Sequence, residues 1–233
     1  MKPPRKNWMT FPDVFIHANE SDVKQHAQYY DAKTGNADAA LALVLDTLSE
    51  AETQRLGQML HQHDPILVSA HAYEQHGVNA IPEVFAAALA TRLNWEVDTG
   101  IVQTNVVSHT GADGFSRLAR QAAFDGVIQA GCDYVLVDDF VGMGGTLSNL
   151  RGFIESGHGN VLAAVALTGK PHSAKLALTA TTLNLLRNKH GDLEQWWVEK
   201  FGHTFDALTE SEARYLVRTP DVATIRDRII AAE

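Results

Sequence analysis

Four short apolar segments, separated by stretches with helical periodicity, constrain the fold of this chain most strongly. Each segment is too short for a typical helix and long enough for a buried strand, and the first follows a proline. Strands that alternate with helices at such spacings form a parallel sheet covered by helices on both faces and joined by right-handed crossovers. The predicted fold class is therefore α/β. The four segments are residues 65–70, 100–107, 134–137 and 161–169.

The stretches between these predicted strands carry helix signals of their own. Residues 80–93 have Pro82 in the first turn and Asn79 in position to cap the helix. Residues 115–130 predict a helix that is broken near a glycine, and residues 146–157 predict one that ends at a glycine. Each predicted strand is thus followed by helical sequence, as a parallel sheet requires.

Helical patterns also fill both ends of the chain. On the N-terminal side, residues 21–30, 37–48 and 49–60 have apolar positions at helical spacing. We therefore predict an N-terminal helical segment over 1–61 and a C-terminal helical segment over 171–233. These two segments flank the α/β core, predicted over 62–170, and we expect all three to form a single folded unit.

Composition and charge limit the partners that the chain can have. The chain has 233 residues, of which 45% are hydrophobic and 20% charged, which is ordinary for a globular protein. A net charge of −9 argues against general nucleic-acid binding, although a local basic cleft is compatible with it. No apolar run approaches the length of a membrane span, and the single Cys132 fits a reducing compartment. We expect a cytoplasmic protein without a membrane partner.

The sequence YVLVDDFVGMGGT, residues 134–146, is the strongest functional signal in the chain. Asp138 and Asp139 stand side by side at the end of a predicted buried strand, where two like charges repel each other. The glycine-rich stretch that follows loses much conformational entropy on ordering. Ligands of parallel sheets bind at the carboxyl ends of the strands. We therefore expect a ligand at this end of the strand.

The residue types in this stretch indicate what the ligand carries. Glycines followed by a helix present backbone N–H groups and the positive end of the helix dipole, which together hold a phosphate. Thr146 adds a hydroxyl donor. The two carboxylates cannot bind phosphate, but they can accept hydrogen bonds from a vicinal diol or hold Mg²⁺. A ligand with a phosphate and a ribose diol fits both requirements.

Residues 135–147, VLVDDFVGMGGTL, resemble the phosphoribosyl pyrophosphate (PRPP) motif of type I phosphoribosyltransferases. The resemblance covers the core, about 110 of the 233 residues, and only these thirteen match closely. It implies a Rossmann-like core in which Asp138 and Asp139 hold the ribose hydroxyls of PRPP, directly or through Mg²⁺ as the cofactor. It also implies that the 5′-phosphate of PRPP lies against Gly142, Met143, Gly144, Gly145 and Thr146.

The resemblance assigns three further parts of a site. A pyrophosphate loop maps onto Ser69, Ala70 and His71. A catalytic loop maps onto residues 108–120, where Arg117 is a candidate catalytic residue and Arg120, one helical turn later, completes a plausible pyrophosphate clamp. Lys170 is the candidate on the side of the base. The flanking helices would supply the part that recognises the base.

Two departures from the family pattern leave the activity open. Gly142 stands where the family commonly has Thr or Asp, and Met143 stands where it commonly has Thr. The loop 69–79 is longer and more polar than the usual pyrophosphate loop. The predicted function is transfer of ribose 5-phosphate from PRPP to a nitrogenous base, with release of pyrophosphate. The alternative is a non-catalytic binder of PRPP or a nucleotide, acting on a protein partner as a regulator or antitoxin-like component.

Other interpretations of these residues are weaker. A dinucleotide site needs glycine where Leu147 stands, a Walker loop needs a Gly-Lys-Ser/Thr ending, and half of a PRPP synthetase needs a second similar domain. The acid pair could also be a solvated cap at a strand end. Residues 71–76 contain two histidines and a glutamate without the spacing of a known metal site. Trp196, Trp197 and Phe201 predict a core or dimer contact, and we expect a homo-oligomer.

Overall fold

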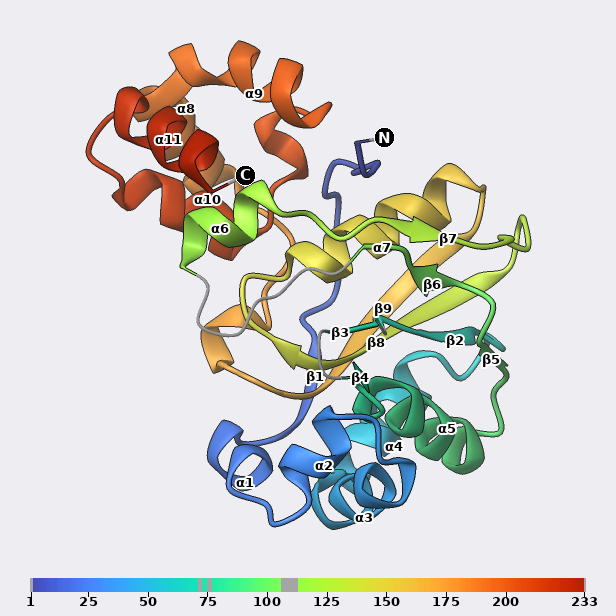
Figure 1. Cartoon of the computed structure of the whole chain (residues 1–233). Coiled ribbons are helices and arrows are strands. Elements are labelled where there is room, and N and C mark those ends of the chain that lie inside the picture. The colour runs from blue at the N-terminus through green and yellow to red at the C-terminus, as the bar shows by residue number, and fades with distance from the viewer. Residues whose placement is uncertain (1, 71–72, 75–76, 106–112, 233) are drawn as a thin grey trace.

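The computed structural model describes residues 2–70, 73–74, 77–105 and 113–232. Its centre is a five-stranded sheet in which every pair of neighbouring strands is parallel (Figure 1). The carboxyl ends of these strands therefore meet along one edge. From one side to the other, the strands are β1 (Phe15–Ala18), β9 (Asn160–Gly169), β8 (Asp133–Val141), β2 (Ile66–Ser69) and β5 (Val97–Asp98).

Helices cover both faces of this sheet, which confirms the predicted fold class. Along β8, Val135 and Val137 face one apolar cluster, whereas Tyr134 and Leu136 face another. This alternation is the period of two that a strand imposes on its side chains. The first cluster packs against α3 (Ala37–Thr47), α4 (Glu50–Met59) and α5 (Ile81–Leu93), and the second packs against α7 (Gly145–Ser156).

The C-terminal residues form a third apolar cluster beside the sheet. The fully buried Trp197 and the buried Phe201 belong to this cluster. The prediction that these two aromatic residues are core residues is therefore confirmed. The cluster also includes the short helix α6 (Gly114–Ala119), which lies against the C-terminal helices in Figure 1. Those helices are α8 (Ala180–His190), α9 (Glu194–Phe201), α10 (Glu210–Arg218) and α11 (Val222–Ala231), with 3₁₀ turns at Pro171–Ser173, Gly191–Leu193 and Phe205–Ala207.

Two predictions in the middle of the chain are wrong. Within 100–107, β6 (Val102–Gln103) pairs antiparallel with β7 (Phe124–Asp125) outside the main sheet, whose edge strand is β5. The helix predicted over 115–130 ends at Ala119. Asn105 accounts for the irregular backbone after this helix, because its side chain donates to the carbonyl of Gln121 and accepts from the N–H of Ala123. These bonds give the backbone partners that a helix would otherwise supply.

The N-terminal segment also differs from expectation. The pattern over 21–30 forms two five-residue helices, α1 (Glu20–Lys24) and α2 (Tyr29–Lys33), in place of one. Strand β1 was not expected and extends the sheet beside β9. The sheet therefore includes residues outside 62–170, while the domain boundaries themselves stay predictions. A small antiparallel ladder joins β3 (Tyr73–Glu74) and β4 (Gly77–Val78).

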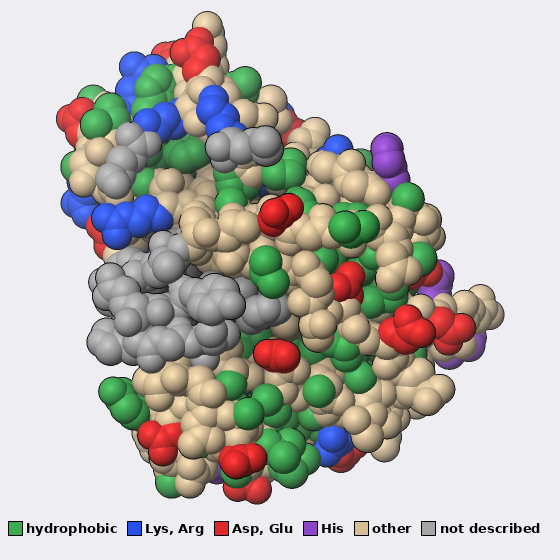
Figure 2. All heavy atoms as spheres, turned by 45° about the vertical axis from the view of Figure 1, so that its right-hand side comes forward, with side chains coloured by type: hydrophobic (Ala, Val, Ile, Leu, Met, Phe, Trp, Pro, Cys, Tyr) green, Lys and Arg blue, Asp and Glu red, His purple; other side chains and the backbone are tan. Residues whose placement is uncertain are grey.

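Charge is unevenly distributed over the surface. On the face in Figure 2, Lys and Arg side chains gather toward the upper left, the end of the molecule where the C-terminal helices lie in Figure 1. Asp and Glu side chains are scattered over the whole of that face. Among the described helices, none combines the length and apolar character needed to cross a membrane.

Candidate functional site

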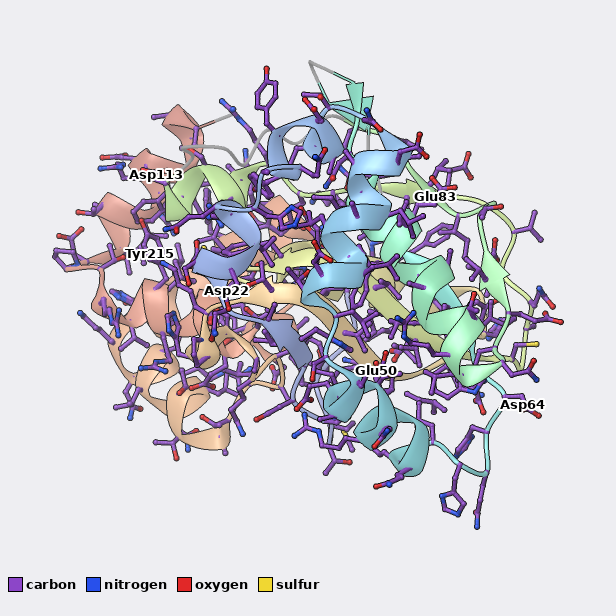
Figure 3. The ribbon with its side chains drawn as sticks, turned by 90° about the horizontal axis from the view of Figure 1, so that it is seen from below. Asp22, Glu50, Asp64, Glu83, Asp113 and Tyr215 are labelled. Carbon is purple, nitrogen blue, oxygen red and sulfur yellow. The ribbon has the colours of Figure 1, made fainter. Side chains whose placement is uncertain are left out.

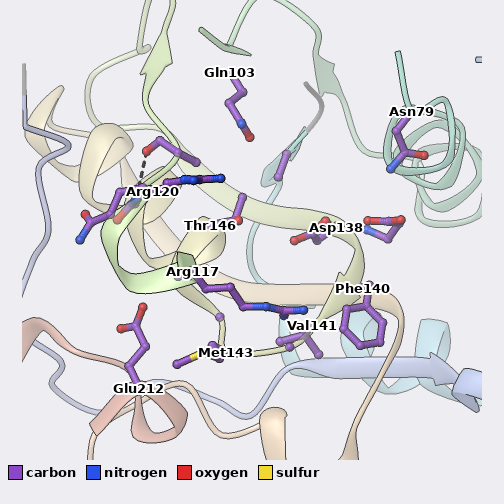
Figure 4. Close-up of a pocket in the computed structure, with 18 of the residues that line it drawn as sticks. Asn79, Gln103, Arg117, Arg120, Asp138, Phe140, Val141, Met143, Thr146 and Glu212 are labelled. Atoms are coloured by element: carbon purple, nitrogen blue, oxygen red, sulfur yellow. Dashed lines mark hydrogen bonds between the residues drawn. The ribbon is translucent and has the colours of Figure 1, made fainter. Parts of the chain in front are cut away.

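A pocket of about 310 Å³ opens at the carboxyl ends of β2 and β8 (Figure 4). Its walls come from the start of the chain, from α1, α2 and α6, from the loop that joins β8 to α7, and from α10. The sheet, the N-terminal segment and the C-terminal helices therefore all contribute to one site. The site residues predicted from sequence that line it are Ala70, Arg117, Arg120, Asp138, Asp139, Gly142, Met143, Gly144, Gly145 and Thr146.

The two carboxylates of the pocket have different surroundings. The alternation of β8 sends neighbouring side chains to opposite faces of the strand. Asp138 is 9% exposed, and its Oδ1 accepts a hydrogen bond of 2.8 Å from the backbone N–H of Asp139. The Oδ2 of Asp139 instead accepts a hydrogen bond of 3.0 Å from the Nζ of Lys33 in α2. Among the described residues, the hydrogen bonds at the acid pair give a cationic partner to Asp139.

This difference separates the pKa values of the pair. Burial, followed by repulsion from Asp139, raises the pKa of Asp138 well above its ordinary value. Burial would also raise the pKa of Asp139, but the ion pair with Lys33 and a hydrogen bond with Asn79 outweigh it and lower that pKa. The pKa of Asp138 therefore lies above that of Asp139, so Asp138 holds a proton more readily and Asp139 more readily carries the negative charge.

The substitution Asp138→Asn should stabilise the protein at neutral and alkaline pH. The raised pKa means that the folded state binds the Asp138 proton more tightly than the unfolded chain does. This carboxyl therefore contributes less to stability as pH rises above about 4, its unfolded value. The amide is neutral at every pH and can still accept the bond from Asp139, so we expect a gain of roughly 1 kcal/mol at pH 8.

Thermal unfolding of wild type and Asp138→Asn between pH 4 and pH 8 measures this effect. The difference in melting temperature should grow as pH rises. An equal or lower melting temperature for the variant at pH 8 would mean that the native carboxyl is ionised and well solvated.

The glycine loop between β8 and α7 lies under side chains from other segments of the chain. An ideal Cβ at Gly142 would stand 2.8 Å from Nη1 of Arg117, and one at Gly145 would stand 2.8 Å from Oε1 of Glu212. Gly144 has a φ of 80°, which favours glycine, and precedes α7 without a capping side chain. The N–H groups at the start of α7 therefore face the pocket without competition from a side-chain cap of their own helix.

Helix α6 places Arg117 in the pocket and is itself held by the C-terminal helices. Asp113 caps α6 through the N–H of Ser116 at 2.8 Å and forms an ion pair with Arg228 of α11. The rings of Phe115 and Tyr215 lie 5.0 Å apart, and Figure 3 shows Asp113 and Tyr215 on the same side of the molecule. Figure 4 shows Arg117 reaching between Asp138 and Met143 toward Phe140. The C-terminal helices thus set the position of Arg117.

The pocket gathers basic side chains in a chain of net negative charge. Five Lys or Arg residues line it, against three carboxylates. The basic side chains outnumber the carboxylates, so the site carries a surplus of positive charge, which favours an anionic ligand. The basic residues are Arg5, Lys24, Lys33, Arg117 and Arg120.

Sequence reasoning missed several of these residues. Lys33 ends α2 and Arg5 precedes the first strand, and neither stands in a motif. Glu212 could be recognised only as part of a capping box, in which it bonds the backbone N–H of Thr209. The ring of Phe140 lies 4.7 Å from the Nζ of Lys24, a contact that no local pattern predicts. Tertiary structure alone brings these groups to the acid pair.

Some predicted site residues lie elsewhere. Lys170 lines a second cavity of about 640 Å³ near β1 and does not line the pocket of the acid pair. Ser69 is 2% exposed at the end of β2 and is not among the residues that line either cavity. The prediction for His71 falls outside the described residues, and so does His76. The roles proposed for Lys170, Ser69 and His71 stay predictions.

The carboxylate oxygens of the acid pair can be compared with what a Mg²⁺ ion requires. Among the described residues, no group of three or more His, Cys, Asp or Glu side chains could hold a metal ion. Asp138 and Asp139 together offer carboxylate oxygens, and Lys33 already occupies one of them. Mg²⁺ is commonly held by one or two carboxylates together with waters and the phosphates of a ligand. The residues present therefore fit a Mg²⁺ ion that arrives with a phosphorylated ligand.

Comparison with known proteins gives two curated relatives. The chain is 39% identical over 229 residues to Protein TraN of Escherichia coli. The matched region covers 98% of this chain and 51% of that protein. It is 36% identical over 151 residues to an uncharacterized protein of Haemophilus influenzae, which covers 64% of this chain and 34% of that protein. The matched region thus spans about half of the length of the first relative and about a third of the length of the second. No family model matches it.

The similar solved structures include phosphoribosyltransferases. An adenine phosphoribosyltransferase matches with a TM-score of 0.39 and 14% identity, covering 57% of this chain and 71% of that one. The enzyme of Saccharomyces cerevisiae matches with a TM-score of 0.38 and 13% identity, covering 64% and 73%. A hypoxanthine phosphoribosyltransferase of Staphylococcus aureus matches with a TM-score of 0.36 and 19% identity, covering 52% and 62%.

Proposed function

We propose that the pocket binds PRPP together with Mg²⁺, and that the protein transfers ribose 5-phosphate from PRPP to a nitrogenous base. The observation that carries the proposal is the meeting of three features in one pocket. These are a buried acid pair at the end of β8, a glycine loop that leads into an uncapped helix, and Arg117 lying over that loop. The acid pair can bind a diol, the glycine loop and the start of the helix can bind a terminal phosphate, and Arg117 can bind a pyrophosphate.

The chemistry that such a site can support is substitution at C1 of the ribose. A nitrogen of the base forms a bond to C1, the bond from C1 to the pyrophosphate oxygen breaks, and pyrophosphate leaves with the electron pair. The base then loses its N–H proton to solvent. Mg²⁺, when bound, would supply positive charge beside the leaving pyrophosphate.

The side chains of the pocket would act by position and charge. Asp139, whose pKa is lowered, can stabilise positive charge that develops on the ribose ring, and Asp138 can form a hydrogen bond with a ribose hydroxyl. Arg117 and Arg120 reach the same pocket from α6 and can donate to the departing pyrophosphate. No covalent intermediate with the protein is needed for this reaction.

A second candidate function is a non-catalytic sensor of PRPP or a nucleotide that acts on a protein partner. One observation favours it. Two of the three carboxylates of the pocket already have cationic partners, Asp139 with Lys33 and Glu212 with Arg5. An active site in which the acids are already neutralised has less charge to offer to a transition state.

Release of pyrophosphate distinguishes the two functions. The full chain with Mg-PRPP should release pyrophosphate with at least one of orotate, adenine, guanine, hypoxanthine, xanthine or uracil. If no pyrophosphate is released with any of the six bases although Mg-PRPP binds tightly, the result would favour the sensor. Failure to bind Mg-PRPP would refute the transferase and the PRPP sensor, and would leave only a sensor of a nucleotide.

Arg117→Ala should slow pyrophosphate release while it leaves PRPP affinity almost intact. A guanidinium that acts on the leaving group contributes mainly in the transition state, and one charge-assisted hydrogen bond corresponds to roughly 10- to 100-fold in rate. Gly142→Thr should have a similar effect, because its Cβ would stand 2.8 Å from Nη1 of Arg117 and displace it.

Steady-state release of pyrophosphate, measured beside PRPP affinity, tests both variants. Arg214→Ala, on α10 and absent from the residues that line the pocket, is the matched control. Equal losses in affinity and rate for Arg117→Ala would make Arg117 an ordinary ligand-binding residue. An increase in rate for Gly142→Thr would contradict the position assigned to Arg117.

A further inference from the structure

The start of α7 faces a buried ion pair formed by two distant segments. Nη1 of Arg5 lies 2.6 Å from Oε2 of Glu212, and the side chains are 1% and 2% exposed. Nη2 of Arg5 donates to the other carboxylate oxygen at 3.0 Å, and Nε donates to Asn149 at 2.5 Å. The guanidinium is thus held in one orientation by two residues.

This ion pair lies directly over the glycine loop. An ideal Cβ at Gly145, the first residue of α7, would stand 3.2 Å from Nη2 of Arg5 and 2.8 Å from Oε1 of Glu212. Arg5 and Glu212 both line the pocket. A phosphate seated on the first N–H groups of α7 would therefore meet a fixed guanidinium and a carboxylate together.

The hydrogen bonds of Arg5 leave donors for such a phosphate. A guanidinium has five N–H donors, and the contacts with Glu212 and Asn149 use one on each of its three nitrogens. Each terminal nitrogen therefore has a second N–H. Because the groups are buried, water screens neither the attraction of Arg5 for a phosphate nor the repulsion from Glu212.

We propose that Arg5 is a ligand of the 5′-phosphate and that Glu212 sets the strength of this contact by competing with the phosphate for Arg5. The inference rests on the proposed function, which places that phosphate at the start of α7. Glu212 therefore acts as a specificity-determining residue. Ligands that carry the 5-phosphate gain from Arg5, whereas ligands that carry only pyrophosphate do not.

Two variants separate the roles of the two charges, and the second of them leaves neither charge buried alone. Glu212→Gln removes the negative charge, and its amide oxygen can still bond Arg5 and the N–H of Thr209, because Gln also forms a capping box. Arg5→Gln with Glu212→Gln removes both charges together, which avoids the large cost of breaking a buried pair. Thermal unfolding shows that each variant is folded before binding is measured.

The experiment compares three ligands on the full chain: ribose 5-phosphate, PRPP and pyrophosphate. Glu212→Gln should bind ribose 5-phosphate and PRPP about tenfold more tightly than wild type, because a repulsive charge is gone. The double variant should bind these two ligands about 10- to 100-fold more weakly than Glu212→Gln does. Affinity for pyrophosphate should change less than about threefold in both variants, which a merely structural role of Arg5 would not predict.

The contradicting outcomes are distinct. Unchanged affinity for the two 5-phosphate ligands in both variants would overturn the role of Arg5 and Glu212 while it leaves the proposed function in place. Equal losses for all three ligands in the double variant would assign Arg5 a structural role and also overturn the inference. Failure of wild type to bind any of the three would overturn the proposed function, and this inference with it.

Discussion

The double substitution Asp138→Asn with Asp139→Asn should abolish measurable binding of Mg-PRPP. Both carboxylates line the pocket, and Asp139 supplies its negative charge at the end of β8. Each charge-assisted hydrogen bond to a ligand corresponds to about 1.5–3 kcal/mol, so the loss of two weakens binding by roughly 10²–10⁴-fold. Equilibrium dialysis with labelled PRPP measures this loss.

The control for this prediction is a measurement that the double variant still folds. The variant also leaves Lys33 without its counter-charge, which costs stability at a site where the ion pair is largely buried. Asp138→Asn alone offsets part of this cost, because it removes a buried acid whose pKa is raised. The far-ultraviolet circular dichroism spectrum should match that of wild type at 20 °C. Unchanged PRPP affinity in the folded double variant would remove the assignment of the ribose to these two residues.

Gly145→Val should have the second largest effect, and it should act on both binding and stability. An ideal Cβ at this position stands 2.8 Å from Oε1 of Glu212 and 3.2 Å from Nη2 of Arg5, and two further methyl groups need still more space. The ion pair must move, and a buried pair that loses its geometry costs about 3–5 kcal/mol. The same methyl groups would stand where the phosphate approaches α7, so PRPP binding should be lost.

Denaturant unfolding and PRPP binding test this substitution together. Gly191→Ala is the matched control, because a Cβ at Gly191 has open space around it and the residue has an ordinary helical φ of −55°. The control should retain wild-type affinity and stability. A Gly145→Val variant with wild-type stability and PRPP affinity would show that neither the ion pair nor a phosphate lies against Gly145.

Local pattern was sufficient for the three central strands of the sheet, β2, β8 and β9, and for the centre of the site. Strand β8 alternates between two apolar clusters and ends in the acid pair, so a run of thirteen residues contains both the strand and its chemistry. Helix α7 and its start after Gly144 follow from the same run. These features depend on neighbours in the sequence, and sequence patterns describe such neighbours well.

The partners of the site depend on contacts between distant segments and could not be predicted in this way. Lys33 and Asp139 are 106 positions apart, and Arg5 and Glu212 are 207 positions apart. A lysine at the end of a five-residue helix and an arginine before the first strand carry no local signal. The helix predicted over 115–130 failed for the same reason, because Asn105 supplies hydrogen bonds from outside the segment.

The position of the phosphates in a crystal structure of the full chain with PRPP and Mg²⁺ tests the central claim most directly. The account predicts the 5′-phosphate within hydrogen-bond distance of the backbone N–H groups of residues 144–146 and of Arg5. It predicts the ribose hydroxyls beside Asp138 and Asp139, and the pyrophosphate on the side of Arg117. Electron density for PRPP in the second cavity beside Lys170, with the pocket of the acid pair empty, would contradict the account.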